Sequence, residues 1–136
     1  MNKTHLSYTF SSSLDELDRL PDILDQITET FSLDNETAAK LMLTVSEAVT
    51  NGIKHGNELT PEKEVYLNVM LSNSNHLQIK VEDQGDGFNP EEVPDPLAEE
   101  NLLKPSGRGV YLMKEYADQV SYNAKGNELI LTFNLP

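Results

Sequence analysis

The chain has 136 residues, no cysteine and a formal charge of −13, from 23 acidic and 10 basic residues. Its length fits one domain with a real hydrophobic core, and the strong negative charge argues against nucleic acid or an anionic membrane as a partner. The absence of cysteine excludes disulfides and thiolate metal sites, and no apolar run has membrane-spanning length or the form of a signal peptide, so we expect a cytoplasmic protein.

The N-terminal part predicts a strand followed by a helical segment. Residues 6–10 alternate apolar and polar side chains, which is typical of a strand. Ser13 and Glu16 match the S-x-x-E capping box, which predicts that a helix begins at this point. Pro21 falls inside the apolar pattern that follows, so we expect the helix to kink or restart there.

A second helix is predicted over about 35–55. Asp34 suits its N-cap, because a short acidic side chain can accept a hydrogen bond from the first backbone N–H groups. Gly56 suits a left-handed cap at the other end. One stripe of this helix is apolar and is expected to face the core: Leu41, Met42, Val45, Ala48, Val49 and Ile53.

The edge of the same helix carries an acid, an amide and an imidazole. Glu47, Asn51 and His55 are spaced four residues apart, so their side chains share one face. At about 100° per residue this polar stripe drifts to the boundary of the apolar arc, where a site could be built. The competing interpretation is an ordinary polar edge on a surface helix.

The middle of the chain predicts a hairpin. Residues 65–72 and 76–83 both alternate in polarity, and a short Asn/Ser turn joins them. Polar residues at alternate positions of the second strand, such as Lys80, imply that one face of the sheet meets water. The residues expected to point into the core are Val65, Leu67, Val69, Leu71, Leu77, Ile79 and Val81.

The C-terminal part predicts a helix over 107–118 and a final hairpin formed by 119–124 and 128–135. Together the elements predict an α+β two-layer sandwich, with helices on one face of a mixed, mainly antiparallel sheet. The whole chain, residues 1–136, is expected to form one domain.

A long irregular segment lies between Gly87 and Gly107. It holds four prolines and, counting from Asp86, six acidic residues before its single base, Lys104. Long loops in compact domains are usually functional lids or disordered linkers. Because glycines bracket this segment on both sides, we interpret residues 88–106 as a lid.

Asp83, Gly85 and Gly87 form a D-x-G-x-G motif directly after the hairpin. Glycines let a ligand approach the backbone closely, and an acid at a strand end can accept a hydrogen bond from an exocyclic amine such as that of adenine. The alternatives are a tight turn or part of a calcium loop. Calcium is disfavoured because no bidentate glutamate follows at the required spacing.

Gly107, Arg108 and Gly109 directly precede the last predicted helix. The N-terminus of a helix exposes unpaired N–H groups and positive potential, which favour a phosphate. Arg108 is one of only two arginines in this acidic chain and could hold phosphate oxygens bidentately. The motif is not a Walker A loop, since no Gly-Lys-Ser/Thr follows, and the alternative is a flexible hinge.

These motifs can be combined into one nucleotide site. Asn51 could offer its amide oxygen to Mg²⁺, and Glu47, one turn earlier, could orient or deprotonate a hydroxyl that attacks a γ-phosphate. Asp83 would contact adenine, and the turn at 107–109 would hold the phosphates under the lid.

The order of the motifs resembles the GHKL ATP-binding fold of gyrase, heat-shock chaperones, histidine kinases and MutL. The motifs are E-x-x-x-N-x-x-x-H on a helix, D-x-G-x-G, and then G-R-G-V opening a helix. Within that fold, SEAVTNGIKHGN and SGRGVYLMKEYADQV are most similar to the anti-sigma-factor serine/threonine kinases. The resemblance covers about residues 8–135 and implies the Bergerat (GHKL) form of the sandwich, as one kinase domain that binds ATP and Mg²⁺.

The resemblance also implies roles for individual residues. The set consists of Glu47 as base, Asn51 as Mg²⁺ ligand, Asp83 at adenine, Gly85 and Gly87 at the nucleotide wall, and Gly107, Arg108 and Gly109 around the phosphates. His55 is either a nucleotide contact or a structural cap. Gly52 and Gly56 depart from the family, in which small alanines are common at these positions, and a mid-helix glycine costs about 1 kcal/mol relative to alanine.

Members of this family phosphorylate a serine on a small anti-anti-sigma (STAS-domain) partner, and many also sequester a sigma factor, usually as homodimers. The resemblance therefore implies a kinase that regulates transcription by partner switching. The first strand, with Tyr8 and Phe10, could form a dimer interface, but internal packing is the default expectation.

Two other functions compete with this interpretation. One is a nucleotide-gated binding module that sequesters a sigma factor or another regulator without significant phosphotransfer. Glu47 favours the enzyme over this module, because a pure binder does not need that acid. The other is the catalytic half of a split histidine kinase, which the lack of dimerisation helices with a phosphoacceptor histidine disfavours.

Overall fold

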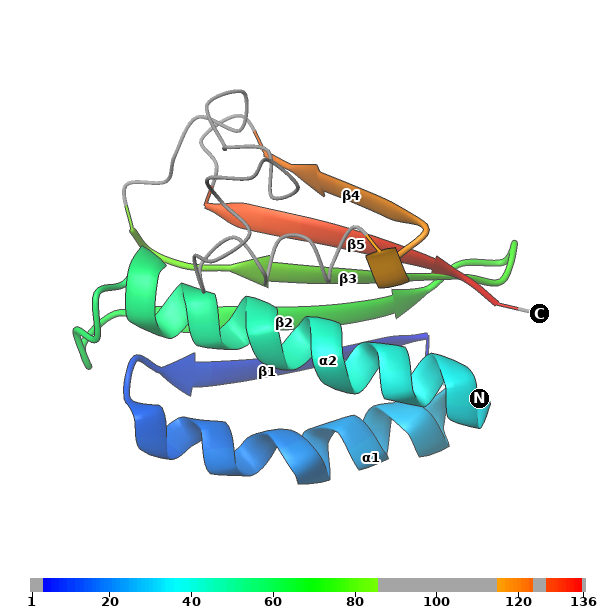
Figure 1. Ribbon diagram of the computed structural model, residues 1–136, viewed down its shortest axis with the longest axis horizontal. Coiled ribbons are helices and arrows are strands. Elements are labelled where there is room, and N and C mark those ends of the chain that lie inside the picture. The colour runs from blue at the N-terminus through cyan, green and yellow to red at the C-terminus, as the bar shows by residue number, and fades with distance from the viewer. Residues whose placement is uncertain (1–3, 86–114, 124–126, 136) are drawn as a thin grey trace, which may run out of the picture.

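The computed structural model describes residues 4–85, 115–123 and 127–135, and these form two layers (Figure 1). Two long helices lie on one face of a five-stranded sheet with the order β1-β2-β3-β5-β4. All four strand pairings are antiparallel. The predicted α+β sandwich is confirmed, and its sheet is antiparallel throughout the described residues. The elements are β1 (His5–Ser11), η1 (Leu14–Arg19), α1 (Leu20–Thr30), α2 (Asn35–Asn51), η2 (Gly52–Gly56), β2 (Glu64–Leu71), β3 (His76–Glu82), β4 (Gln119–Tyr122) and β5 (Glu128–Asn134).

The core lies between the helices and the sheet, where period-two alternation in the strands places one apolar row per strand. In register, Leu67 of β2 lies opposite Val81 of β3, and Ile79 lies opposite Leu131 of β5. Nearly all the strand residues expected inside are buried, Leu71 being half-buried. In β1, Phe10 is fully buried, which confirms internal packing for that side chain.

The N-terminal helical segment departs from its prediction at its first residue. The Ser13 side chain makes no capping hydrogen bond, so the predicted capping box is wrong. The Glu16 carboxylate instead accepts a 2.9 Å hydrogen bond from the backbone N–H of Ser11, and this bond lowers the pKa of Glu16. The tight 3₁₀ turn of η1 changes the positions that a capping box requires. The restart expected at Pro21 is confirmed, because α1 begins at Leu20 with the proline in its first turn.

Helix α2 begins as predicted and buries a slightly different face. Asp34 is its N-cap, and the carboxylate accepts a 2.9 Å hydrogen bond from the Thr37 N–H. Met42 is 53% exposed, so its assignment to the core is wrong, whereas Thr44 is fully buried. The Thr44 hydroxyl can enter the core because it donates to the Lys40 carbonyl one turn earlier.

The C-terminal end of α2 widens into the π-helical turn η2. The Asn57 N–H donates to the Gly52 carbonyl five residues back, at 2.8 Å. Gly56 does not take the left-handed conformation, so its predicted role as a left-handed cap is wrong. The chain reverses two residues later, where Glu58 and Leu59 have positive φ angles.

Several predicted features fall on residues outside the described ranges. These are the lid at 88–106, Gly87, the turn at 107–109 and most of the helix over 107–118, of which Glu115 and Tyr116 are described and helical. Within the described residues, no helix has the length and apolar character needed to cross a membrane.

Candidate functional site

Glu47 and Asn51 lie one turn apart in the last two turns of α2, and both side chains are half-buried. The residues one position further along, Ala48 and Gly52, are buried against the sheet, so the polar pair flanks the buried stripe as the spacing predicted. Among the described residues, neither of these two side chains has a hydrogen-bond or ion-pair partner. The backbone of His55 lies in η2, and its side chain is not among the described features.

The turn η2 packs against the start of β2 and against Asp83, the residue after β3, and two glycines make this approach possible. A Cβ at Gly52 would lie 3.2 Å from a Val65 methyl and 3.8 Å from the Asp83 Cβ. A Cβ at Gly56, one turn later, would overlap the Asp83 carboxylate, with Oδ1 only 2.8 Å away. Gly52 and Gly56 therefore let η2 lie against Asp83, the proposed adenine contact.

Hydrogen bonds hold both the side chain and the backbone of Asp83. Its Oδ1 accepts a 2.9 Å bond from the Gly85 N–H, and its backbone N–H donates to the Asn127 carbonyl at 2.9 Å. The Asn127 side chain donates back to the Asp83 carbonyl at 3.0 Å. Gly85 also packs closely, since a Cβ there would overlap the Gly56 carbonyl group. The D-x-G half of the motif is thus a fixed wall beside η2.

Asn57 also belongs to this region, although no role was predicted for it from the sequence. Its side chain is fully buried and bonds to the segment that follows β3. Its partners lie up to 45 residues away in the chain, so no local pattern indicates them. The only local signal is an asparagine directly after the helix, which ordinary turn chemistry also explains.

The side chains present fit a magnesium nucleotide better than a bare metal ion. Among the described residues, no group of three or more histidine, cysteine or acidic side chains could hold a metal. Mg²⁺ is commonly held by one or two hard protein oxygens, with substrate phosphates and water completing its shell. The amide oxygen of Asn51 is a donor of that kind, and the Glu47 carboxylate lies one turn earlier on the same helix.

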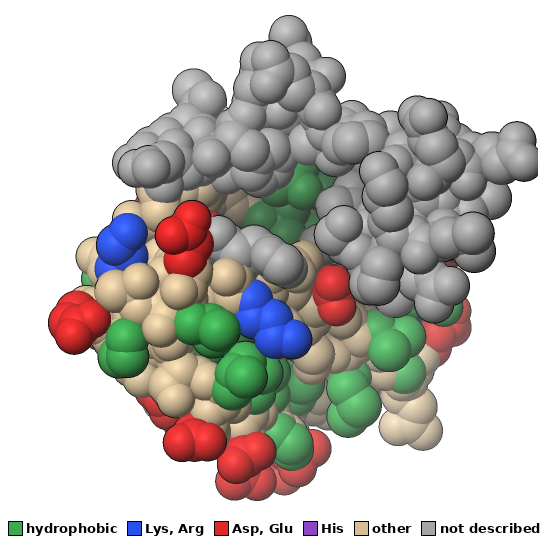
Figure 2. Space-filling model, turned by 60° about the vertical axis from the view of Figure 1, so that its left-hand side comes forward, with side chains coloured by type: hydrophobic (Ala, Val, Ile, Leu, Met, Phe, Trp, Pro, Cys, Tyr) green, Lys and Arg blue, Asp and Glu red, His purple; other side chains and the backbone are tan. Residues whose placement is uncertain are grey.

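The electrostatics of this end of the molecule restrict how a polyanion could bind. Figure 2, with the C-terminal end of α2 turned forward, shows acidic side chains around the described surface and few basic ones. Lys54 and Lys63 are exposed near the candidate site. In a chain with a charge of −13, a nucleotide would need a metal ion and local donors to offset this field.

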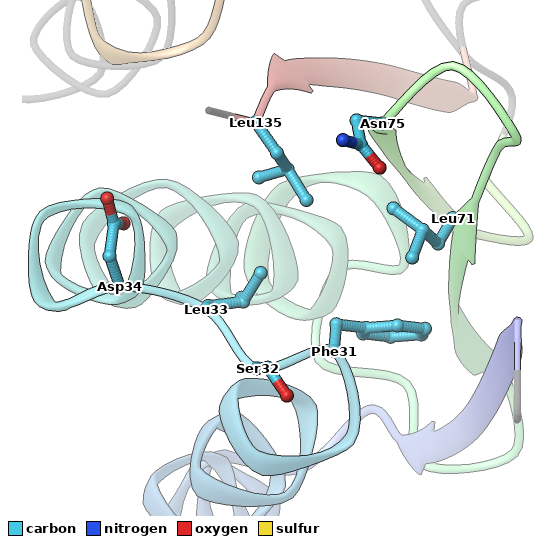
Figure 3. Close-up of a pocket in the computed structure, with 7 residues that line it drawn as sticks. All are labelled: Phe31, Ser32, Leu33, Asp34, Leu71, Asn75 and Leu135. Carbon is cyan, nitrogen blue, oxygen red and sulfur yellow. The ribbon is translucent and has the colours of Figure 1, made fainter.

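A pocket of about 310 Å³ lies at the opposite end of α2 (Figure 3). It is lined by Phe31, Ser32, Leu33, Asp34, Leu71, Asn75 and Leu135. Its one carboxylate, on Asp34, caps α2 through the Thr37 N–H. None of the predicted nucleotide contacts lines it, so this pocket is separate from the candidate site.

Comparisons with known proteins give the family of this chain. The family model described as a histidine kinase-like ATPase domain matches residues 10–133. The chain is 34% identical over 131 residues to the anti-sigma F factor of Anoxybacillus flavithermus, covering 93% of this chain and 86% of that protein. It is 30% identical over 121 residues to the anti-sigma F factor of Priestia megaterium, covering 88% of this chain and 73% of that protein.

Two solved structures share the fold. The RsbU and RsbW domains of Rv1364c from Mycobacterium tuberculosis match with a TM-score of 0.69 at 15% identity, covering 98% of this chain and 33% of that one. The histidine kinase domain of a blue-light-activated kinase from Erythrobacter litoralis matches with a TM-score of 0.53 at 22% identity, covering 88% of this chain and 60% of that one. At these identities the matches speak for the fold alone. The sequence matches carry the assignment further: this chain belongs to the histidine kinase-like ATPase (GHKL) family and, within it, to the anti-sigma factor family.

Proposed function

We propose that this chain is a Mg-ATP-dependent serine/threonine protein kinase of the anti-sigma-factor type. Its substrate is a serine on a STAS-domain anti-anti-sigma partner, and it regulates transcription in the cytoplasm by switching between that partner and a sigma factor. The proposal includes a homodimer, as the family resemblance implies. The observation that carries it is the half-buried pair Glu47 and Asn51, one turn apart at the C-terminal end of α2, in a chain of the anti-sigma factor family.

The chemistry divides between the nucleotide and the two side chains on α2. ATP supplies the phosphoryl group and Mg²⁺ offsets the charge on its phosphates. Asn51 is the proposed Mg²⁺ ligand through its amide oxygen. The Glu47 carboxylate accepts the proton of the substrate serine hydroxyl as that oxygen bonds to the γ-phosphorus and the bond from this phosphorus to the ADP oxygen breaks. A positioned base contributes about 10²–10⁴-fold to such a step.

The nucleotide contacts come from the wall at the end of β3 and from segments outside the described residues. The proposed set is Asp83 at the adenine amine, Gly85 and Gly87 along the wall, Gly107, Arg108 and Gly109 at the phosphates under the lid at 88–106, and His55 as a further nucleotide contact. Support for the described part is the tight packing of Asp83 and Gly85 on η2.

The second candidate function is a nucleotide-gated module that binds a sigma factor or another regulator without significant phosphotransfer. The names of the relatives favour keeping it, because "anti-sigma F factor" describes an action on a sigma factor and does not mention a kinase. Both functions use the same nucleotide site and differ in the need for Glu47.

The test is γ-phosphate transfer from labelled Mg-ATP into a lysate of the source organism, with the wild type and Glu47→Gln compared. We expect the wild type to label a small protein on serine. Glu47→Gln keeps the size of the side chain but removes the base, so it should bind ATP normally and transfer at least about 100-fold more slowly. Full transfer by Glu47→Gln would contradict the assigned base, and ATP binding without any labelled protein would favour the binding module.

A second variant, Asp83→Asn, tests the adenine contact. The Gly85 N–H must still face an oxygen, so the new amide group turns its NH₂ toward the nucleotide, where it opposes the adenine amine. We expect ATP affinity to fall by about tenfold or more, as measured by calorimetry. Unchanged ATP affinity would show that Asp83 does not contact the base.

A further inference from the structure

The buried amide of Asn57 joins the segment after β3 to the rest of the domain. We propose that Asn57 is a positioning residue for nucleotide binding: it holds Asp83 and Gly85 in place against the end of α2. This inference rests on the proposed ATP site and adds a residue that does not itself touch the nucleotide. It concerns base recognition more than phosphotransfer.

The Asn57 side chain makes three hydrogen bonds, which use both of its N–H donors and its oxygen, and it is fully buried. Its Oδ1 accepts from the Gln84 N–H at 2.7 Å. Its Nδ2 donates to the Glu64 carbonyl at 3.0 Å and to the Ser12 Oγ at 2.8 Å. One amide group therefore connects the loop after β1, the start of β2 and the segment after β3 to the residue that follows η2.

The orientation of this amide is fixed by its backbone partners. The Gln84 N–H can only donate and the Glu64 carbonyl can only accept, so the oxygen and the nitrogen of the amide cannot exchange places. Aspartate would place an oxygen against the Glu64 carbonyl, and leucine would leave both backbone groups without their partner. A short amide is the side chain that satisfies both at this distance.

The bond to Gln84 acts at the middle of the proposed nucleotide wall. Gln84 stands between Asp83 and Gly85, and both of these neighbours pack against Gly56, the residue before Asn57. The Gln84 side chain adds a second tie, since its Oε1 accepts from the Glu64 N–H at 2.6 Å. With the Asn57 bond lost, the Gln84 N–H needs water or a new partner, and the carboxylate of Asp83 moves with the backbone.

The position of this carboxylate matters for the base of the nucleotide and much less for its phosphates. Asn57 should therefore affect discrimination between ATP and purine riboside triphosphate, an analogue without the exocyclic amine that Asp83 is proposed to contact. A residue that only stabilised the fold would change the unfolding temperature and leave this discrimination unaltered.

The experiment measures dissociation constants for ATP and for purine riboside triphosphate, with Mg²⁺, at a temperature well below unfolding. In Asn57→Ser we expect ATP affinity to fall by about tenfold, with little change for the analogue. The matched control is Ser12→Ala. It removes two other bonds of the same network, the one that the Ser12 hydroxyl accepts from Asn57 and the one that it donates to the Lys63 carbonyl, while the bond between Asn57 and Gln84 stays. It should lower the unfolding temperature and keep the preference for ATP.

The outcomes separate this inference from the proposed function. A wild type that binds no ATP would overturn the proposed function and this inference with it. A wild type that prefers ATP, together with an Asn57→Ser variant of unchanged preference, would overturn the positioning role alone. If Asn57→Ser does not fold, amide exchange of the wild type replaces it. Exchange of the Gln84 N–H as fast as an exposed amide would then contradict the bond itself.

Discussion

The two ends of helix α2 are built in different ways. At the N-terminal end, the exposed Asp34 caps the helix through a surface hydrogen bond beside the open pocket of Figure 3. At the C-terminal end, Gly56 meets the strand end at Asp83 and Gly85, and the buried Asn57 secures the contact. A substitution at the N-terminal end affects one exposed side chain, whereas a substitution at the C-terminal end requires closely packed backbone segments to move. The candidate site is at the C-terminal end.

Among the substitutions around the two ends of α2, Gly85→Ala is expected to have the largest effect on stability and on ATP binding. The new Cβ would overlap the Gly56 carbonyl group, with its carbon 2.7 Å away, and backbone cannot yield as a flexible side chain can. We expect the free energy of unfolding to fall by about 3 kcal/mol, with loss of ATP binding. Urea unfolding followed by circular dichroism measures the first quantity. A stability equal to the wild type would show that the two segments do not pack as described.

Gly56→Ala should disturb binding more than stability. Its Cβ would occupy the place of the Asp83 carboxylate, so Asp83 must turn away from η2. The better helix propensity of alanine offsets part of the strain, and we expect a net loss of about 1 kcal/mol. ATP affinity should fall by about tenfold, as in Asp83→Asn. Normal ATP binding in this variant would contradict either the packing or the role of Asp83.

Gly52→Ala is the matched control on the same face of the helix. Its Cβ would lie 3.2 and 3.3 Å from the two Val65 methyl groups, which can give way by a few tenths of an ångström. The propensity gain of about 1 kcal/mol should roughly balance this crowding, so stability should stay within about 0.5 kcal/mol of the wild type. A large loss would mean that the whole helix end, and not only its last turn, is closely fitted to the sheet.

The smallest effect is expected from Asp34 at the N-terminal end of α2, as a change in how stability depends on pH. Hydrogen bonds from the Thr37 side chain and backbone hold the pKa of Asp34 below its ordinary value of 3.8. A lowered folded-state pKa adds stability above the ordinary pKa, and this is lost as the pH falls through the folded value. Asp34→Asn keeps a good N-cap without the charge, so its stability should depend less steeply on pH below about 4. The free energy of unfolding is measured by urea titration at several pH values. The same dependence on pH in Asp34→Asn and in the wild type would contradict this assignment.

Local patterns predicted the elements well where one residue decides the outcome with its near neighbours. The Asp34 cap, the restart at Pro21 and the alternating strands are of this kind. The predictions failed where a nearby residue took the hydrogen bond or the buried position that had been assigned to another. Ser11 took the Glu16 carboxylate that the capping box assigned to Ser13, and Met42 turned outward while Thr44 was buried.

The candidate site could be predicted only in part. Each of its motifs is a local sequence pattern, but the contacts between the motifs join residues that are distant in the chain. The spacing of Glu47 and Asn51 placed them on one edge of a helix, and both are half-buried there. The reason for Gly56 was misjudged, because its neighbour in space is Asp83, 27 positions further along the chain. A backbone cap and a close approach to another segment require the same residue type, so the sequence could not distinguish them.

The sequence by itself determined which segments become strands and helices, which face of each is apolar, and the order of the nucleotide motifs. These properties follow from side-chain period and from contacts within a few residues. Only the tertiary structure decided that η2 packs against Asp83 and Gly85, the residues that follow β3, and that Asn57 accepts a hydrogen bond from the distant Gln84. Those contacts arise when the apolar faces pack together, and their partners are set by the geometry of the whole sandwich.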